Sequence, residues 1–167
     1  LPDDWKVVPR GHIVGSKIYK EGESYYNLFI PKYIGVDDKG RSVWEKFDSK
    51  TGRRDTTTRY SEAARDSSRV LYKNIDPLVR GGFSTDVEFF GFDFNASFAY
   101  QIGGRTLDYT YQRLMHGGSD RGVALHADQL KAWTEEKKSD IPKMNYLDGD
   151  VNNNSSRFFT SRSYFSI

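Results

Sequence analysis

The sequence predicts an all-β chain of antiparallel strands, and three observations support this class. Side chains alternate between apolar and polar over residues 82–102, which is the period of a β-strand because successive side chains point to opposite faces. Aromatic residues make up 15% of the chain within a hydrophobic share of 37%, so the apolar content lies in rings rather than in Leu, Ile and Val. Turns rich in glycine, proline and aspartate separate the shorter strand patterns.

Residues 82–102 carry the strongest pattern, and we expect a β-hairpin whose short connection is Phe90, Gly91 and Phe92. Before the turn, the apolar set is Phe83, Thr85, Val87 and Phe89, and the polar set is Ser84, Asp86 and Glu88. After it, the apolar set is Phe92, Phe94, Ala96, Phe98, Tyr100 and Ile102, and the other set is Asp93, Asn95, Ser97, Ala99 and Gln101. Such strands are typical of transmembrane β-barrels, but a soluble sandwich alternates in the same way. The residues alone leave both open.

The chain before the hairpin predicts short strands joined by turns. Residues 1–10 are expected to be irregular, residues 12–19 and 25–30 to contain strands, and residues 42–47 to belong to a second hairpin with its turn at 38–40. Residues 48–52 predict another turn. Residues 61–69 predict one or two helical turns at the surface, with Ser61 as the N-cap. Asn74, Pro77 and the pair Gly81-Gly82 are expected to break the chain ahead of the hairpin.

After the hairpin the character of the sequence changes. Gly103 and Gly104 are expected to interrupt the strand, and residues 103–157 to form a long, mostly irregular connection. Within it, residues 126–138 predict a short helix, because Leu130 and Trp133 lie three positions apart. A strand is expected to resume near Phe158 and to be unfinished at the end of the chain. A long connection after a very short turn is typical of outer-membrane barrels.

Composition excludes several classes of protein. The 25 basic and 23 acidic residues leave a net charge of +2, which offers no electrostatic case for nucleic acid. The absence of cysteine excludes a disulfide scaffold and a thiolate metal site but does not define the compartment. No apolar run is long enough for a membrane helix, and residues 1–4 do not resemble a signal peptide, so an exported protein would lack its amino terminus here.

Two groups of oxygen ligands deserve a chemical interpretation. Asp86, Glu88 and Asp93 lie on polar positions of the hairpin, where they represent either a glycosidase pair or the wetted face of a sheet; we favour the wetted face.

A second group alternates like the first ligands of a calcium loop: Asp148, Asp150, Asn152 and Asn154. Asn153 replaces the expected glycine and Phe159 the bidentate glutamate, so a solvated loop is our main interpretation and calcium the alternative.

The remaining candidates are histidines and aromatic rings. His12, His116 and His126 are scattered without a metal-binding spacing, so we predict neither a metal centre nor a catalyst, and no cofactor. Aromatic rings with exposed faces can stack on sugars. The candidates for such contacts, each of which is otherwise interpreted as a packing residue, are Trp44, Tyr109, Tyr111 and Trp133.

A series of short motifs resembles a known family. In order, they are YIGVD (33–37), GGF (81–83), GFD (91–93), YQIGG (100–104), LM (114–115), WT (133–134), IP (141–142), SRF (156–158) and SY (163–164). No single motif is specific, but their shared order over residues 25–167 resembles the carboxy-terminal part of SusC/RagA-like TonB-linked outer-membrane proteins. One departure is Glu135-Glu136 after Thr134, where the family often has a proline.

The resemblance implies transport rather than catalysis. Residues 1–167 would be a fragment of a plugged barrel of about 22 strands, without the plug and the final strands, in the outer membrane of a Gram-negative bacterium. The implied partners are a SusD-like surface lipoprotein, TonB through the missing amino-terminal part, outer-membrane lipid, and an oligosaccharide or peptide solute. The rival interpretations from the residues are a soluble carbohydrate-binding β-domain and a glycosidase domain.

On the barrel interpretation, the hairpin separates lipid from water. The residues expected to face lipid are Phe83, Val87, Phe89, Phe92, Phe94, Phe98, Tyr100 and Ile102. Those expected to face the wet lumen are Asp86, Glu88, Asp93, Asn95 and Gln101. The long connection over residues 103–157 would then contribute to the outer mouth, with the turn at Gly91 on the periplasmic side.

Overall fold

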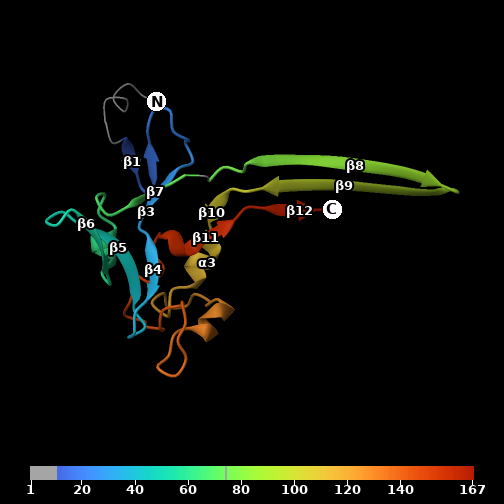
Figure 1. Ribbon diagram of the computed structural model, residues 1–167. Coiled ribbons are helices and arrows are strands. Elements are labelled where there is room, and N and C mark those ends of the chain that lie inside the picture. The colour runs from blue at the N-terminus through green and yellow to red at the C-terminus, as the bar shows by residue number, and fades with distance from the viewer. Residues whose placement is uncertain (1–10, 74) are drawn as a thin grey trace.

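A computed structural model describes residues 11–73 and 75–167, and it consists of a lobe from which one long hairpin projects (Figure 1). The hairpin is formed by β8 (Val79–Phe89) and β9 (Phe92–Ile102). The short strand β12 (Tyr164–Ser166) lies antiparallel to β9, so the order in this sheet is β12-β9-β8. The predicted irregular segment at residues 1–10 and the predicted break at Asn74 lie outside the described residues.

The central hairpin is confirmed, and its turn is tighter than predicted. Pairing runs without a register shift from Val79↔Ile102 to Phe89↔Phe92, so Phe92 belongs to the strand and the loop has two residues. Phe90 and Gly91 have φ of 48° and 78°, and positive φ at both loop positions is what a type I′ turn requires. Positive φ is unusual for a bulky residue; the Phe90 ring packs edge-on against that of Phe89, 4.3 Å between centroids.

The prediction that Gly81 and Gly82 break the chain is wrong, because both lie inside β8. They pair with Tyr100 and Ala99 of β9, so the strand continues through both glycines. A Cβ atom on Gly81 would lie 2.7 Å from the hydroxyl of Tyr100, so the tyrosine ring lies across the glycine. The glycine is therefore a site of close packing within the strand rather than its boundary.

Before the hairpin, the lobe contains two antiparallel sheets. The first has the order β1-β2-β3-β7, formed by β1 (His12–Val14), β2 (Lys17–Tyr19), β3 (Leu28–Ile30) and β7 (Val70–Tyr72). The second has the order β4-β5-β6, formed by β4 (Tyr33–Val36), β5 (Ser42–Asp48) and β6 (Arg53–Thr57). The predicted hairpin around residues 38–40 is thus confirmed as β4-β5, and the strand within residues 25–30 is limited to its last three residues.

The predicted helix near residue 61 is present, but its start and its burial differ from expectation. α2 (Tyr60–Ala63) begins at the N-cap Arg59, so Ser61 lies inside the helix and does not cap it. The amide of Arg59 donates to the hydroxyl of Thr57, which helps to fix the earlier start. Ala63 is fully buried. The helix is therefore anchored to the lobe through its one small apolar side chain.

The helix predicted over residues 126–138 is not formed. Only a short 3₁₀ turn, η1 (Ala127–Lys131), is present; Leu130 is 90% exposed and Trp133 is 8% exposed, so the two do not share a face. The backbone amide of Trp133 donates to the carbonyl of Ile141 at 2.8 Å, which takes it out of any helical ladder. The Trp133 ring packs directly on Gly40, where a Cβ atom would lie 2.5 Å from it. Tertiary packing thus overrides the local pattern.

Three elements of the second half were not predicted, namely a strand, a helix and a second 3₁₀ turn, whereas the strand expected to resume near Phe158 is present. β10 (Arg105–Leu107) pairs antiparallel with β11 (Phe159–Ser161), and α3 (Tyr109–Leu114) follows β10, capped by the Asp108 carboxylate. A second 3₁₀ turn, η2 (Ser156–Phe158), leads into β11. Gly103 and Gly104, each with φ of 78°, separate β9 from β10 as expected. No helix of residues 11–73 and 75–167 is long and apolar enough to cross a membrane.

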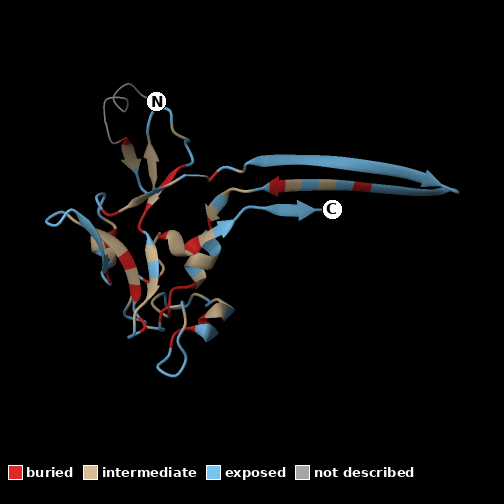
Figure 2. Ribbon diagram, in the orientation of Figure 1, coloured by how far each residue is buried: buried red, intermediate tan, exposed pale blue. Residues whose placement is uncertain are grey.

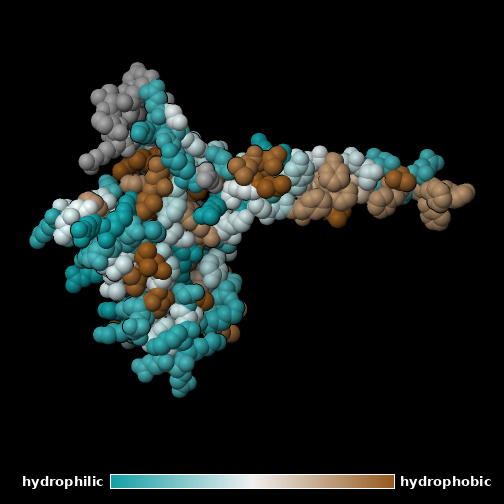
Figure 3. Space-filling model, in the orientation of Figure 1, coloured by the Kyte–Doolittle hydropathy of each residue, from teal (hydrophilic) through white to brown (hydrophobic). Residues whose placement is uncertain are grey.

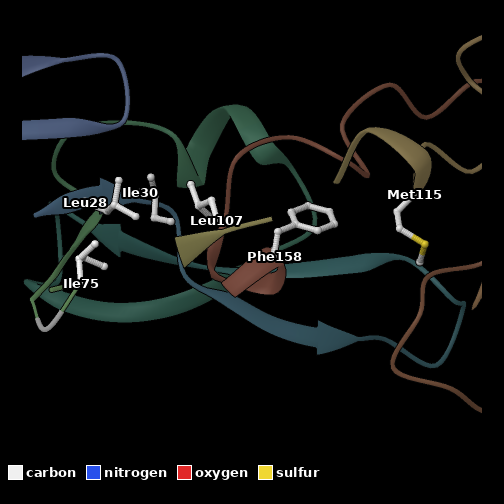
Figure 4. Packing of buried hydrophobic residues seen from close by; sticks show 6 residues of the cluster. All are labelled: Leu28, Ile30, Ile75, Leu107, Met115 and Phe158. Atoms are coloured by element: carbon white, nitrogen blue, oxygen red, sulfur yellow. The ribbon is translucent and has the colours of Figure 1, made fainter. Parts of the chain in front are cut away.

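The core of the lobe joins the parts of the chain before and after the hairpin (Figure 4). Its buried members are Leu28, Ile30, Ile75, Leu107, Met115 and Phe158. Phe158, which is 1% exposed, packs near the ring of Tyr111, 6.2 Å between centroids. The hairpin therefore projects from a lobe whose core contains residues from before and after it, and this core holds both ends of the hairpin in place.

A buried arginine reinforces this closure. Arg157 donates from Nη1 to the carbonyl of Val151 at 2.9 Å, and its guanidinium lies 5.7 Å from the ring centroid of Tyr33 in β4. Burial lowers the pKa of Arg157, and burial also raises the pKa of Tyr33 to about 12. The two groups link β4 to the segment that leads into β11.

Candidate functional site

The register of the hairpin places its apolar side chains on one continuous face. Cross-strand pairs on this face include Phe83↔Phe98, Val87↔Phe94 and Val79↔Ile102. The rings of Phe83 and Phe98 stack with 4.6 Å between centroids and 18° between planes, and Phe165 of β12 lies 5.7 Å from Phe98. Figure 3 shows the resulting apolar band along the projecting arm. The predicted division of side chains into two sets is confirmed in the geometry.

The opposite face carries only polar or small side chains. Its pairs are Arg80↔Gln101, Gly82↔Ala99, Ser84↔Ser97, Asp86↔Asn95 and Glu88↔Asp93. The amide of Asn95 donates to the carboxylate of Asp86. Glu88 lies directly across from Asp93, and such like-charged pairs are destabilising unless water screens them. This face therefore requires an aqueous environment.

The rest of the chain leaves most of the hairpin uncovered; only Ala96 and Gln101, both in β9, are buried. Every residue of β8 is exposed, and the ring of Phe92 is 80% exposed and that of Phe90 86% (Figure 2). A contiguous apolar surface of this kind marks an interaction site rather than a surface for water. The apolar face thus needs a partner that is itself apolar, whereas the polar face needs water.

The length of the hairpin matches a bilayer. With 11 residues in each strand, and a rise of roughly 3.3 Å per residue, each strand is about 36 Å long. A tilt of about 45°, usual in membrane barrels, reduces this to about 25 Å along the membrane normal, which is the height of the apolar band of such barrels. Glu88 and Asp93, which pair across the two strands, are both exposed, so their carboxylates are open to water.

The aromatic residues proposed as solute contacts lie apart in the lobe. Trp44 and Trp133 are 3% and 8% exposed, so neither presents a ring face to solvent. Tyr109 is exposed on α3. Tyr111 is half-buried; its hydroxyl donates to the Asp128 carboxylate at 3.3 Å, and burial, followed by the charge of Asp128, raises the pKa of its phenol. Tyr109 therefore has the most accessible ring of the four, and solute contact stays a prediction.

An exposed tyrosine cluster was missed by the sequence analysis. Tyr19 and Tyr25 lie with 5.0 Å between ring centroids, Tyr26 packs edge-on against Tyr25, and the ammonium of Lys17 lies 4.6 Å from the centroid of Tyr25. The signal in the sequence was the pair Tyr25-Tyr26, which was assigned to a strand. The strand β3 begins only at Leu28, which leaves both rings in the connection.

The four candidate calcium ligands make other contacts. The Asp148 carboxylate accepts from the amide of Asp150, and the Asp150 carboxylate accepts from the side chain of Asn153. The side-chain oxygen of Asn154 accepts from Gln112 at 2.8 Å, and its amide group donates to Ser16. The backbone oxygen of Asn152 also accepts from Gln112. No group of three or more acidic or histidine side chains gathers for a metal ion among the described residues, and the solvated loop stays our main interpretation, with calcium the alternative.

Two of the histidines have local structural contacts. The ring of His116 is 1% exposed, and its Nδ1 accepts from the amides of Gly118 and Asp120 at 3.2 and 3.1 Å. The Nδ1 of His126 accepts from the amide of Asp128 and caps η1. Both rings organise the loop that contains them, as expected for loop residues.

Comparison with solved structures supports the β architecture described above. No family model matches the chain, and no curated protein matches it. Among solved structures, the RagAB peptide transporter shares 22% sequence identity with a TM-score of 0.69, covering 93% of this chain and 17% of that chain. The RagAB peptide importer matches at 22% identity in a "closed-closed" state, with a TM-score of 0.67 over 93% of this chain and 17% of that chain, and in an "open-open" state, with 0.60 over 92% and 16%.

This likeness establishes a shared fold. It agrees with the order of motifs that resembles SusC/RagA-like proteins and with the antiparallel β architecture. The chain spans about a sixth of the length of the chains it matches. The matched chains belong to a transporter rather than an enzyme.

Proposed function

We propose that this chain is part of the wall and outer lobe of a TonB-dependent outer-membrane transporter. The observation that carries the proposal is the hairpin β8-β9, whose uninterrupted register separates an apolar face from a charged one over a length that suits a bilayer. Residues 1–167 would be a fragment of a large barrel whose plug and further strands lie elsewhere in the protein. Free edges of β8 and β12 would then pair with neighbouring strands of the wall.

The proposed orientation places the lobe outside the cell. Barrels of this class have short periplasmic turns and long extracellular connections, and the two-residue turn at Phe90 and Gly91 contrasts with the lobe at the other end of the same strands. In this orientation the apolar face contacts lipid and the polar face hydrates a passing solute. The lobe contributes to the outer mouth.

The solute we propose is a peptide or an oligosaccharide, delivered by a SusD-like surface lipoprotein, with energy supplied through TonB. The matched structures are of a peptide transporter and a peptide importer, which supports a peptide in particular. No catalytic step is needed for this task. The chemistry of the chain is limited to solvation, packing and reversible contact.

The first test of this function is made in the source organism. An antibody raised against residues 116–138 should detect a polypeptide several times larger than 19 kDa in the outer-membrane fraction. Deletion of its gene should abolish growth on the peptide or oligosaccharide that it imports, and complementation should restore it. A soluble species of 19 kDa would overturn the proposal and favour the alternative, a soluble carbohydrate-binding β-domain.

A further inference from the structure

An open pocket lies where the hairpin leaves the lobe, at the lobe end of the polar face. It has a volume of about 520 Å³, and its polar groups come from Tyr26, Asp76, Arg80, Gln101 and Arg162. Arg80 and Gln101 belong to β8 and β9, and Asp76 and Arg162 lie just before β8 and β12 of the same sheet. Tyr26 belongs to the tyrosine cluster. On the proposed function, this position is the outer mouth of the lumen.

Two arginines flank a glutamine in this pocket. Arg80 of β8 lies directly across from Gln101 of β9, and Tyr164 of β12 lies across from Gln101 on the other side. Arg162 precedes Tyr164 by two positions, and its main chain is held in place because the Gln101 amide donates to the Arg162 carbonyl at 2.8 Å. The amide of Arg162 in turn donates to the Gly104 carbonyl. Both arginines therefore extend from a fixed backbone frame.

The two guanidinium groups are not neutralised by the described part of the chain. Arg80 and Arg162 are exposed and form no ion pair with any described residue. The one carboxylate that lines the pocket, Asp76, accepts a hydrogen bond from the Ser24 hydroxyl at 2.7 Å. The pocket thus has a formal charge of +1, from two arginines and one aspartate. A monoanion complements this charge better than a dianion does.

We propose that Arg80 and Arg162 form an entry site for a carboxylate group of the incoming solute. The planar guanidinium fork matches a carboxylate with two parallel hydrogen bonds, and the exposed ring of Tyr26 offers an apolar or stacking contact beside it. Such a carboxylate is supplied either by a peptide, at its C-terminus or an acidic side chain, or by a uronic acid of an oligosaccharide. The inference rests on the proposed function and narrows its solute to carboxylate-bearing molecules.

The charge further along the same face fits an entry site. Asp86, Glu88 and Asp93 follow on the polar face toward the turn, so an anion is attracted at the mouth and meets no second cationic site on this hairpin. Contacts that are favourable enough to admit a solute must also be weak enough to release it. The arrangement favours capture at the mouth followed by release into the lumen.

The test compares binding of paired probes to the purified full-length protein that contains this chain. The peptide pair is an N-acetylated oligo-alanine with a free C-terminus and its C-terminal amide; the sugar pair is an oligogalacturonate and its methyl ester. The double variant Arg80→Gln/Arg162→Gln should weaken binding of the free acid of one pair at least roughly tenfold. The amide or ester should bind equally to both proteins. The pair that responds identifies the source of the carboxylate.

Arg53→Gln is the matched control, because Arg53 is an exposed arginine of β6 without an ion pair among the described residues. It should leave all affinities unchanged. Equal affinity for acid and neutral probes in the unaltered protein, no binding of either acid, or no effect of the double variant would each overturn the inference. Failure of the proposed function is a separate result, since it appears as a soluble polypeptide in the antibody experiment.

Discussion

If the proposed function is right, Phe98→Arg destabilises the inserted full-length protein by about 2–4 kcal/mol, because it places a cation on the proposed lipid face near the middle of the membrane. Phe98 lies near the centre of β9 and stacks on Phe83 of β8, so the variant also loses a ring contact. The free energy of folding into lipid vesicles, measured by denaturant titration, gives the effect directly. Phe94→Arg should behave similarly, with a smaller cost because Phe94 lies closer to the turn.

The matched control for this prediction is at Ser97, which directly precedes Phe98 in β9. Ser97→Arg places the same side chain on the polar face, opposite Ser84, where water solvates it, and it should change the folding free energy by less than about 1 kcal/mol. Asp93→Asn should be nearly silent for the same reason. Equal sensitivity at positions 97 and 98 would contradict the assignment of the two faces.

The second large effect is expected in the core of the lobe. Phe158→Ala should destabilise the lobe by about 3–5 kcal/mol, because it removes a large buried ring and leaves a cavity between the two halves of the chain. Phe158 is 1% exposed and belongs to the cluster that contains Leu28, Ile30 and Leu107. The loss of stability is measured as a decrease in the denaturant concentration at which a protease cleaves the lobe of the full-length protein.

Leu130→Ala is the control for the lobe, since Leu130 is 90% exposed. Removal of an exposed leucine side chain should change stability by no more than about 0.5 kcal/mol. If the two variants are equally resistant to the protease, the core around Phe158 does not hold the lobe together. If Phe158→Ala also prevents insertion of the hairpin, the lobe contributes to assembly of the wall.

The sequence was most informative where structure is local. The hairpin could be predicted because period-two alternation and a two-residue connection occur within one continuous segment, and the register follows from the turn at Phe90 and Gly91. The motif order across the chain then pointed to the family of folds that the solved structures support. Local pattern and global fold agree in this region.

The lobe was less predictable because its contacts join distant segments. β10 pairs with β11, which lies more than fifty positions away, and each strand has three residues, too few to show a period. Trp133 illustrates the same limit, since its burial against Gly40 removes it from the helix that its spacing with Leu130 predicted. The glycines inside β8 were misjudged because their close contacts are with β9: Gly81 lies against the ring of Tyr100 and Gly82 against the carbonyl of Phe98.

The arginine pocket could not have been identified from spacing. Arg80 and Arg162 are about eighty positions apart and are brought together by the order β12-β9-β8. One signal was present in the sequence: Arg80 continues the polar set of β8 beyond Ser84 and reverses its charge relative to Asp86 and Glu88. This charge reversal marks the end of β8 that adjoins the lobe.

The central claim, that β9 separates lipid from water, is tested most directly by cysteine accessibility. These 167 residues contain no cysteine, so single cysteines are introduced at positions 93–98 of the full-length protein, with any cysteines elsewhere removed, and are labelled in intact outer membranes. The account predicts that cysteines at 93, 95 and 97 react with a charged, water-soluble maleimide, and that those at 94, 96 and 98 react only with a lipid-soluble one. Equal reaction of both sets with the water-soluble reagent would contradict it.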